Sequence, residues 1–444
     1  MTADAVSPAG IDFGRHVRRM RAAGHLVVQP RMGFGRPEQM RAGLLATRRA
    51  RAATVGTITL DSFTRVGDLD AVRRALRDGT GLNGYPIASH DAATTAAVLR
   101  DLHEPAFPVQ VRHGSAVPQH IFTALAQVGI TATEGGPVSY CLPYGQTPLA
   151  ESVRNWEECV DLFVSLTTAA RPHLETFGGC LMGQLCPPSL LVAVTVLEAL
   201  FFCSRGVSSV SVSYAQQTSL DQDIEAVGAL RRLCAEMLPT EDWHVVIYAY
   251  MGVYPTTPPG ARRLLGEAVR VAAATGSERL IVKTVAESIR IPTIEENVEA
   301  LETAEDWART YGVADVPPPA PDSQIYAEAY ALISAVLNLD SDVGRALVLA
   351  FQHGYLDVPY CLHPDNAGRA RGYIDDTGRL RWAEIGAMPL RKLVRTVGGH
   401  RVTASGLLAD LNYVRQKFDS EQPSLPARSR TSSATAITGG GTAL

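Results

Sequence analysis

The chain has no excess of basic residues. Its 444 residues carry 41 basic and 45 acidic side chains, which gives a net charge of −4. Proteins that bind nucleic acid need a basic stripe to neutralise phosphates, so this balance argues against a nucleic-acid partner. Lysine is scarce: Lys283, Lys392 and Lys417 are the three in the chain, so 41 − 3 = 38 of the basic residues are arginine. A lysine that ends an apolar strand, as Lys283 does, therefore indicates that a compact ammonium group is needed there.

Long apolar runs are also missing. The longest, residues 190–203, contains Thr195 and Glu198 and is too short to cross a bilayer, so it predicts a buried helix. The first 20 residues lack the apolar core that a secretory signal contains. The 7 cysteines, an odd number without a CxxC pair, favour free thiols in a reducing compartment. We therefore expect a cytoplasmic protein with no membrane partner.

Several familiar site patterns are absent from the sequence. The glycine-rich fingerprints of phosphate loops and of dinucleotide-binding folds do not occur. No histidines are spaced with acidic partners in the way that zinc sites require. We therefore expect no metal site built from this chain's own residues.

What the sequence does contain is a repeated strand–helix pattern. Short β-branched runs alternate with helical segments, and they lie at residues 26–30, 54–60, 81–87, 108–114, 130–136, 178–185, 208–214, 244–252 and 279–284. Such repetition builds a parallel sheet with helices outside it, and about eight or nine units over roughly 300 residues fit a closed (β/α)8 barrel. The run at 81–87 is the weakest strand, and we expect it to be surplus.

A proline-rich segment at residues 313–322 predicts a domain boundary. We expect a catalytic barrel over residues 1–312 and a mainly helical extension over 313–420, with helices near 324–353 and 386–418. Residues 421–444 are rich in Ser, Thr, Gly and Pro without periodicity, and this composition predicts a disordered tail.

Charged residues follow the predicted strands at one end. Three of these strand-like runs each end in an arginine, a fourth ends in a glutamate followed by two tyrosines, and the residues are Arg31, Arg65, Arg112, Glu134, Tyr140 and Tyr144. Reactive groups of (β/α)8 barrels gather at the carboxyl ends of the strands. The planar guanidinium group matches a carboxylate two hydrogen bonds at a time. Three such groups with one acid and two phenols would suit an amino diacid such as glutamate. The alternative is that each arginine is a separate surface residue.

The segment Glu134–Tyr144 supports a site at this position. Its glycines permit a tight loop and a close approach of the backbone to a ligand. The two tyrosines, four residues apart, can reach one ligand from one side. A glycine turn with packed aromatic residues is the alternative. His113 directly follows Arg112, and we expect it to orient its neighbour by hydrogen bonding.

Many blocks of the sequence together resemble one known family. The blocks are QPRMG, TLDSFTR, LNGYP, VRHG, EGG-xxx-Y-xxP-Y, PPS, VKTVAESIRIPT and PDNAGRARGYIDDTG-RxRWxEIGAMP, in this order from about residue 25 to 400. They resemble the large (epsilon) subunit of glutamate mutase, also called methylaspartate mutase. The resemblance implies an adenosylcobalamin-dependent isomerase with a (β/α)8 barrel, which interconverts L-glutamate and L-threo-3-methylaspartate by a radical mechanism.

The resemblance also implies a partner. In this family a separate small (sigma) subunit holds the cobalamin, and two copies of each chain form a heterotetramer. The Asp-x-His-x-x-Gly motif that supplies the cobalt ligand in many cobalamin proteins is incomplete here, since alanine replaces the glycine after Asp101-Leu-His103. We therefore expect the cobalt ligand to come from the small subunit.

Site residues follow from the resemblance, residue by residue. Arg31, Arg65 and Arg112 resemble the arginines that hold the two substrate carboxylates. Glu134 matches the acid that meets the substrate amine and acts as a general base, and Tyr140 and Tyr144 complete the pocket. The positions that match cofactor contacts are Gly33, Asn83, Pro143, Phe177, Tyr254, Lys283, Glu287 and Ile291.

Three rival functions stay open on the sequence. The first is a cobalamin mutase that acts on a different amino diacid. The second is a non-radical barrel lyase or aldolase that uses Lys283 or a bound divalent metal. The third is a homologue without catalytic activity that serves as a scaffold for the small subunit.

Overall fold

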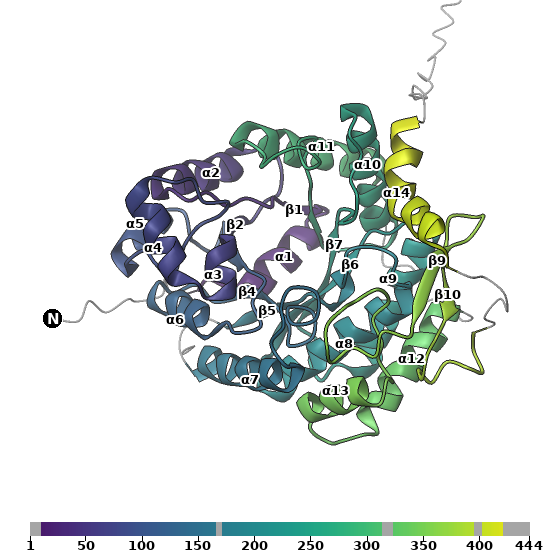
Figure 1. Ribbon diagram of the computed structural model, residues 1–444. Coiled ribbons are helices and arrows are strands. Elements are labelled where there is room, and N and C mark those ends of the chain that lie inside the picture. The colour runs from purple at the N-terminus through teal and green to yellow at the C-terminus, as the bar shows by residue number, and fades with distance from the viewer. Residues whose placement is uncertain (1–9, 166–170, 313–322, 395–401, 421–444) are drawn as a thin grey trace, which may run out of the picture.

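The computed structural model describes residues 10–165, 171–312, 323–394 and 402–420 (Figure 1). Within these residues, eight parallel strands form one sheet in the order β1-β8-β7-β6-β5-β4-β3-β2. A parallel bridge between Val28 and Thr54 joins β1 to the residues just before β2, and the Val28 N–H donates to the carbonyl of Ala53 at 2.8 Å. This contact closes the sheet, and the (β/α)8 barrel is confirmed. The strands are β1 Val27–Gln29, β2 Gly56–Thr59, β3 Val109–Arg112, β4 Ala132–Gly135, β5 His173–Thr176, β6 Ser209–Ala215, β7 Trp243–Tyr248 and β8 Arg279–Ile281.

Helices surround the strands as a ring (Figure 1). Side-chain caps begin several of them: the Asp61 carboxylate accepts from the backbone N–H groups of Phe63 and Thr64 at 3.0 Å, and Thr293 and Glu296 form a capping box. The helices of this part of the chain are α1 Phe13–Ala22, α2 Pro37–Arg49, α3 Ser62–Val66, α4 Leu69–Asp78, α5 Ala92–Leu99, α6 Gln119–Gln127, α7 Leu149–Ser165, α8 Pro188–Ser204, α9 Leu220–Met237, α10 Pro258–Ala274 and α11 Ile294–Tyr311, with a 3-10 turn η1 at Gly178–Cys180.

Helix α8 is buried on nearly every side, as its mostly apolar sequence predicts. It packs against β5, β6 and α9 on the barrel side and against α12 (Gln324–Leu337) and α13 (Val343–Gln352) on the other. Its apolar cluster continues into both of these C-terminal helices, which therefore share the core of the barrel. Among the described residues, no helix has the length and apolar character that a membrane span requires.

Helix α1 lies against the amino ends of the strands. Phe13 is 1% exposed, and its ring lies 5.0 Å from the imidazole of His173 and 5.0 Å from the guanidinium of Arg279. Both contacts are with the first residues of their strands, β5 and β8. A Cβ atom at Gly14 would come 2.5 Å from Ser209 Oγ, so the small residue lets the helix sit close to β6.

The interior of the barrel is polar at one level, where barrels of this kind usually carry Val, Ile and Leu. The amide of Gln29 donates to Thr57 Oγ1 at 2.9 Å and to Gln110 Oε1 at 2.8 Å. Arg279 forms an ion pair with Glu175, and both are fully buried. Because these groups bind one another, the interior contains charge without leaving it uncompensated.

The run at 81–87, expected to be surplus, forms a single bridge between Tyr85 and Leu60 and no strand. The expected strand at 178–185 is wrong. The segment 178–185 begins with the turn η1, because Gly178 and Gly179 pack directly on the backbone of Thr195 and Ser213. The fifth strand is His173–Thr176 (HLET), which lacks alternating apolar residues because two of its side chains face the polar interior.

The C-terminal extension lies beside α7–α10 (Figure 1). Besides α12 and α13 it contains an antiparallel hairpin, β9 Arg371–Ile374 and β10 Leu380–Glu384, and the helix α14 Ala404–Ser420. The expected helix near 386–418 is too long at its start, since residues 386–393 form turns and loop. The predicted boundary at 313–322 and the predicted tail at 421–444 lie outside the described residues.

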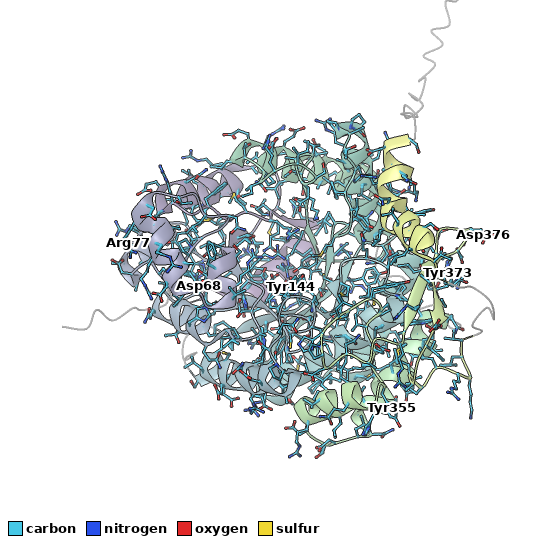
Figure 2. The ribbon with its side chains drawn as sticks, viewed as in Figure 1. Asp68, Arg77, Tyr144, Tyr355, Tyr373 and Asp376 are labelled. Carbon is cyan, nitrogen blue, oxygen red and sulfur yellow. The ribbon has the colours of Figure 1, made fainter. Side chains whose placement is uncertain are left out.

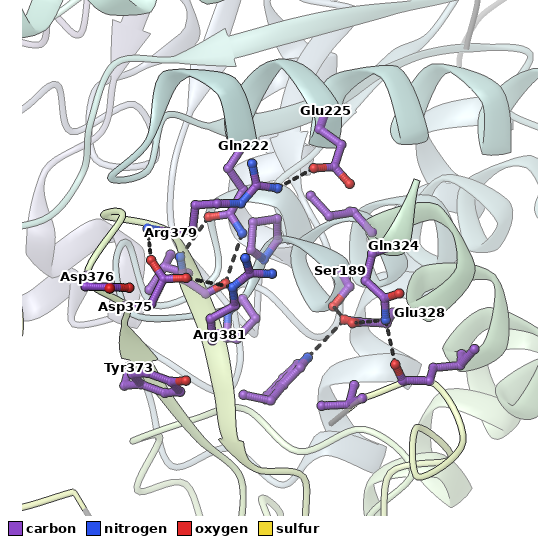
Figure 3. Close-up of a pocket in the computed structure, with 17 residues that line it drawn as sticks. Ser189, Gln222, Glu225, Gln324, Glu328, Tyr373, Asp375, Asp376, Arg379 and Arg381 are labelled. Atoms are coloured by element: carbon purple, nitrogen blue, oxygen red, sulfur yellow. Dashed lines mark hydrogen bonds and ion pairs between the residues drawn. The ribbon is translucent and has the colours of Figure 1, made fainter. Parts of the chain in front are cut away.

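A cavity of about 660 Å³ lies between the hairpin and helices α8, α9 and α12 (Figure 3). Its polar side chains bind one another: Glu225 pairs with Arg379, and Glu328 accepts from Ser189 Oγ at 2.6 Å and from the indole of Trp382 at 3.1 Å. None of the predicted site residues lines it. This cavity therefore reflects the packing of the extension, and the site is to be sought elsewhere.

Candidate active site

A buried ion pair forms the centre of the site at the carboxyl ends of β3 and β4. Arg112 Nε donates to Glu134 Oε2 at 2.7 Å, and the two side chains are 3% and 1% exposed. The Tyr140 hydroxyl donates to Glu134 Oε1. A buried charge pair is stable only where further hydrogen bonds satisfy its remaining polar atoms. Here the glutamate has such bonds on both of its oxygens.

Two arginines of the site have unpaired hydrogen-bond donors. Among the described residues, Arg112 Nη1 and Arg31 Nε are buried and have no hydrogen-bond partner. Buried donors in native proteins are nearly always paired, and unpaired ones commonly mark a functional site. These donors are thus available to an anionic ligand.

A second charged cluster follows β1 and β8. Glu287 Oε1 lies 3.1 Å from Arg31 Nη1 and 3.0 Å from Lys283 Nζ. The ammonium of Lys283 also lies 5.1 Å from the centre of the Tyr254 ring, a cation–π distance. Burial lowers the pKa of Lys283 to about 8, although the charge of Glu287 acts in the opposite direction.

Arg65 lies in a different local structure from the one expected. Strand β2 ends at Thr59, and Arg65 belongs to the short helix α3 that follows, so it does not itself end the strand. Its Nε donates to the carbonyl of Leu60, the residue after the strand, at 2.9 Å. This bond turns the side chain back toward the strand end.

The three arginines nevertheless lie within range of one another's charge. Burial lowers the pKa of Arg65, and the charges that act on it include those of Arg31 and Arg112 and of Tyr140 and Glu134. Burial raises the pKa of Tyr144 to about 12, and the charges that act on it include those of Arg31, Glu134 and Arg65. The structure thus brings all the predicted substrate residues to one end of the barrel, at the carboxyl ends of the strands. This end is called the mouth.

Aromatic rings line this mouth. The ring of Phe177, which follows β5, lies 4.9 Å from that of Tyr140 and 6.5 Å from that of Tyr144. Tyr144 is 49% exposed and lies over the centre of the ring of helices, whereas Arg77 lies at the outer edge (Figure 2). The aromatic side chains thus provide an apolar wall next to the charged groups.

The other residues matched to cofactor contacts lie on the loops around the mouth. Gly33 packs so closely on the carbonyl of Thr59 that a side chain would overlap it. Asn83 Oδ1 accepts from the Ser62 N–H at 2.9 Å, at the start of α3. Pro143 is half-buried beside Tyr144, and Ile291 is 56% exposed after β8. Their predicted roles toward a cofactor stay predictions.

His113 is held as a neutral, packed ring. It stacks on Trp156 with ring centres 5.7 Å apart, and its Nδ1 accepts from the Ser115 N–H at 3.3 Å. Burial, with the charge of Arg65, lowers the pKa of His113 to about 3. The ring therefore supports the loop after Arg112 and carries no charge at neutral pH.

Three polar residues of the site were missed in the sequence, and they are Tyr248, Glu175 and Glu198. Tyr248, at the end of β7, places its hydroxyl 2.7 Å from Glu134 Oε2 and also bonds to Glu175. Glu198 lies in the middle of helix α8. Polar residues inside apolar or barrel-facing segments were the available signal, since a buried carboxylate or phenol must have a partner.

Glu198 ties two site loops together. It accepts from the Ser139 N–H at 2.9 Å, the Ser139 hydroxyl at 3.0 Å and the Phe177 N–H at 3.3 Å. Ser139 belongs to the loop after β4, and Phe177 to the loop after β5. Burial raises the pKa of Glu198 to about 7, against the effect of these hydrogen bonds.

The charge balance of the mouth favours anions. Two acids, Glu134 and Glu287, stand among four cations, so the surplus of positive charge is 4 − 2 = 2, and the cations are Arg31, Arg65, Arg112 and Lys283. A ligand with two carboxylates would neutralise this surplus. Within the described residues, no three His, Cys, Asp or Glu side chains form a group that could hold a metal ion.

Comparison with known proteins identifies relatives of this chain. The chain is 31% identical over 351 residues to the glutamate mutase epsilon subunit of Escherichia coli O157:H7, covering 75% of this chain and 72% of that protein. It is 29% identical over 415 residues to the glutamate mutase epsilon subunit of Halobacterium salinarum, covering 88% and 86%. A solved structure that it resembles, the tryptophan synthase alpha chain from Legionella pneumophila, is 10% identical with a TM-score of 0.39, covering 68% of this chain and 98% of that one. The family model of the methylaspartate mutase E chain matches residues 8–411, and the chain belongs to this family.

Proposed function

We propose that this chain is the catalytic large subunit of an adenosylcobalamin-dependent carbon-skeleton mutase that interconverts L-glutamate and L-threo-3-methylaspartate. The observation that carries the proposal is the meeting of three arginines with one buried acid at the end of the barrel. Family membership and the surplus of positive charge at the mouth support the same substrate class.

The arginines would hold the substrate by its ionic ends. A carbon radical has no charge that a protein can grip, so control must come from fixing the carboxylates and excluding water. Paired arginine–carboxylate hydrogen bonds are strong and directional. Arg31, Arg65 and Arg112 come from different loops or strand ends, so together they fix position as well as orientation.

Glu134 would meet the substrate ammonium and act as a general base. It is buried, and Arg112 and Tyr140 hold its two oxygens in place. A positioned carboxylate can take a proton from the ammonium while the substrate radical fragments and return it afterwards. We assign Glu134, Arg65 and Arg112 to catalysis, and Arg31, Tyr140 and Tyr144 to binding.

Several features fit a bound adenosylcobalamin at the same mouth. When bound, this cofactor supplies a carbon-centred radical by homolysis of its cobalt–carbon bond. The buried hydroxyl of Tyr254 has no hydrogen-bond partner among the described residues, and Lys283 and Glu287 lie beside it. We propose that these three hold the cofactor together with Gly33, Asn83, Pro143, Phe177 and Ile291.

A small cobalamin-binding subunit would cover the mouth and supply the cobalt ligand. Exposed apolar side chains lie on the helix α3 and on the loops after β3, β4, β7 and β8, and they are Phe63, Val66, Val117, Tyr144, Val253, Ile289 and Ile291. Apolar groups exposed together commonly mark a protein interface. We propose a heterotetramer of two such chains with two small subunits.

The direct test combines this chain with a cobalamin-binding small subunit and adenosylcobalamin, and measures 3-methylaspartate formed from L-glutamate. Close amino diacid analogues, tested in the same complex, decide between glutamate and another substrate. Turnover of an analogue but not of glutamate would reassign the substrate. Absence of radical signals with every amino diacid would favour the scaffold function.

One observation favours a lyase or aldolase as the second candidate. Lys283 is buried with a pKa lowered to about 8, which leaves part of its amine neutral and nucleophilic near that pH. Against it, Glu287 holds the ammonium in an ion pair. Borohydride trapping of a carbonyl compound on Lys283, or turnover without cobalamin, would establish this candidate.

A further inference from the structure

Tyr248 is placed between two carboxylates. Its side chain is 1% exposed, and its hydroxyl lies 2.7 Å from Glu134 Oε2 while also bonding to Glu175 Oε1. Arg112 Nη2 donates to the hydroxyl oxygen of Tyr248 at 3.4 Å. A phenol has a single proton to donate. Tyr248 can therefore donate to Glu134 or to Glu175, but not to both at once.

Glu175 is a fixed anion. Burial alone would raise the pKa of Glu175, but the Arg279 guanidinium and the Tyr248 hydrogen bond hold it below its usual range. Ser211 Oγ and Gln110 Nε2 donate to its other oxygen at 3.0 and 3.1 Å. A proton on Glu175 would leave the buried Arg279 without a counter-charge. Glu175 thus competes for the proton of Tyr248 and does not store a second one.

Glu134 differs from Glu175 in the hydrogen bonds that it accepts. Arg112 and Tyr140 each donate to one of its oxygens, so Tyr248 is its third donor. Each hydrogen bond donated to a carboxylate stabilises the ionised form. The other charged or titratable groups that lie within range of the charge of Glu134 are Arg65 of α3, Tyr144 of the loop after β4 and Cys180 of η1.

We propose that Tyr248 is a positioning residue that switches the base strength of Glu134 by turning its hydroxyl between Glu134 and Glu175. The proposal rests on the function proposed above, in which Glu134 takes a proton from the substrate ammonium. Donation to Glu134 weakens it as a base, and donation to Glu175 strengthens it.

The proton step is balanced. The ammonium N–H bond breaks, its electron pair stays on nitrogen, and the proton bonds to Glu134 Oε2. The hydroxyl of Tyr248 is then turned to Glu175, and its oxygen accepts from the new carboxylic O–H. Return of the proton to the amine reverses each change, so the site gains and loses no proton over a turnover.

Tyr248→Phe removes the hydroxyl and keeps the ring, which contacts Phe177 at 5.5 Å and Arg112 at 5.1 Å. With one donor fewer on Glu134, we expect the acid limb of the kcat profile to move up by about one pH unit, since a hydrogen bond to a charged group is worth about 1.5 kcal/mol or more. Tyr214→Phe is the matched control, because Tyr214 is equally buried and its hydroxyl bonds to Asp223 at 2.8 Å, away from Glu134.

Ser211→Ala provides the sharper measurement. Ser211 donates to Glu175 and not to Glu134, and it carries no charge. Without the Ser211 hydroxyl, Glu175 loses one hydrogen-bond donor, so the Tyr248 hydroxyl donates to Glu175 more often and to Glu134 less often. The acid limb of the kcat–pH profile therefore moves to higher pH, by less than in Tyr248→Phe. In the Tyr248→Phe background this shift must vanish, because the double-mutant cycle measures coupling through the hydroxyl.

An equal Ser211→Ala shift in both backgrounds would overturn the switch, and so would a Tyr214→Phe shift as large as that of Tyr248→Phe. The carboxyl infrared band of Glu134, identified by its loss in Glu134→Gln and titrated in this chain alone, must follow the same pattern. This measurement needs no substrate. If the assembled complex fails to convert glutamate while the band shifts as expected, the proposed function fails and the switch stands.

Discussion

The carboxylate of Glu198 accepts from both the backbone N–H and the hydroxyl of Ser139, at 2.9 and 3.0 Å. Through this pair, a helix on the outside of the barrel holds the loop that carries Tyr140. The same carboxylate holds the loop of Phe177. The positions of the two loops therefore depend on one buried acid, Glu198.

Glu198→Gln should flatten the pH dependence of stability. Burial raises the pKa of Glu198 from 4.5 to about 7, so its stabilising contribution is complete below pH 4.5 and is lost as pH rises through about 7. The loss amounts to about 3 kcal/mol for a shift of this size. Denaturant unfolding at pH 5 and pH 8 measures it. Glu299→Gln, on an exposed residue of α11, serves as control, and an unchanged slope in Glu198→Gln would contradict the assignment.

Gly136→Ala should disturb the same loop. A Cβ atom at Gly136 would overlap the Glu198 carboxylate, so either the loop after β4 or this hydrogen-bonded carboxylate must move. We expect a loss of about 2 kcal/mol in the free energy of unfolding, as for overpacked interiors. Gly228→Ala on helix α9 has open space around it and should be neutral or stabilising. Equal stabilities of the two variants would show that the loop tolerates the extra carbon.

Arg65→Lys should lose most turnover. An ammonium cannot replace the two parallel hydrogen bonds of a guanidinium, and a small displacement of the substrate costs about 100-fold in rate. Arg77→Lys, on the exposed face of α4, is the matched control and should keep full activity (Figure 2). Steady-state kinetics of the assembled complex measures both. Near-normal kinetics in Arg65→Lys would contradict the role of Arg65 in holding the carboxylates.

Ile289→Asp should weaken binding of the small subunit. Ile289 is 75% exposed on the loop after β8, so the change has little effect on folding. We expect at least about a 10-fold rise in the Kd, since burial of a charge at an apolar interface costs about 1.4 kcal/mol or more. Leu408→Asp on α14, at 62% exposure, is the control. Calorimetric titration with the small subunit distinguishes them, and equal affinities would place the interface elsewhere.

Assembly with the small subunit and cofactor should protect Lys283 from reductive methylation. The chain has three lysines, so peptide mapping assigns each modification without ambiguity. Lys392 is exposed and should react equally in the free chain and in the complex. Lys283 is buried and paired with Glu287, so it should react more slowly than Lys392 in the free chain, and assembly should slow it further. An equal rate for Lys283 in both states would contradict its contact with the cofactor.

The sequence predicted the barrel and the face that carries the site. Arg31, Arg112 and Glu134 could be placed because they end, or directly follow, apolar strands whose direction is known. Arg65 needed the structure, since its approach to the mouth depends on the short helix α3 and a hydrogen bond to Leu60. Long-range geometry of this kind leaves no local pattern.

The polar barrel interior could not be predicted in the same way. Strand β5 was missed because its Glu175 faces Arg279, an interaction between residues far apart in the chain. The contacts of Tyr248 with Glu134 and Glu175 were missed for the same reason. The hairpin β9–β10 did leave a signal, since Asp375 and Gly378 form its turn, but the flanking strands alternate weakly.

The position of helix α1 affects where substrate can enter and product can leave. Phe13 packs against the first residues of two strands, so helix α1 covers the amino end of the barrel. Within the described residues, substrate and product would therefore enter and leave at the opposite end, which the exposed apolar side chains border. A small subunit bound there would control when substrate enters and product leaves. The rate of exchange would therefore depend on how often that subunit dissociates from this end of the barrel.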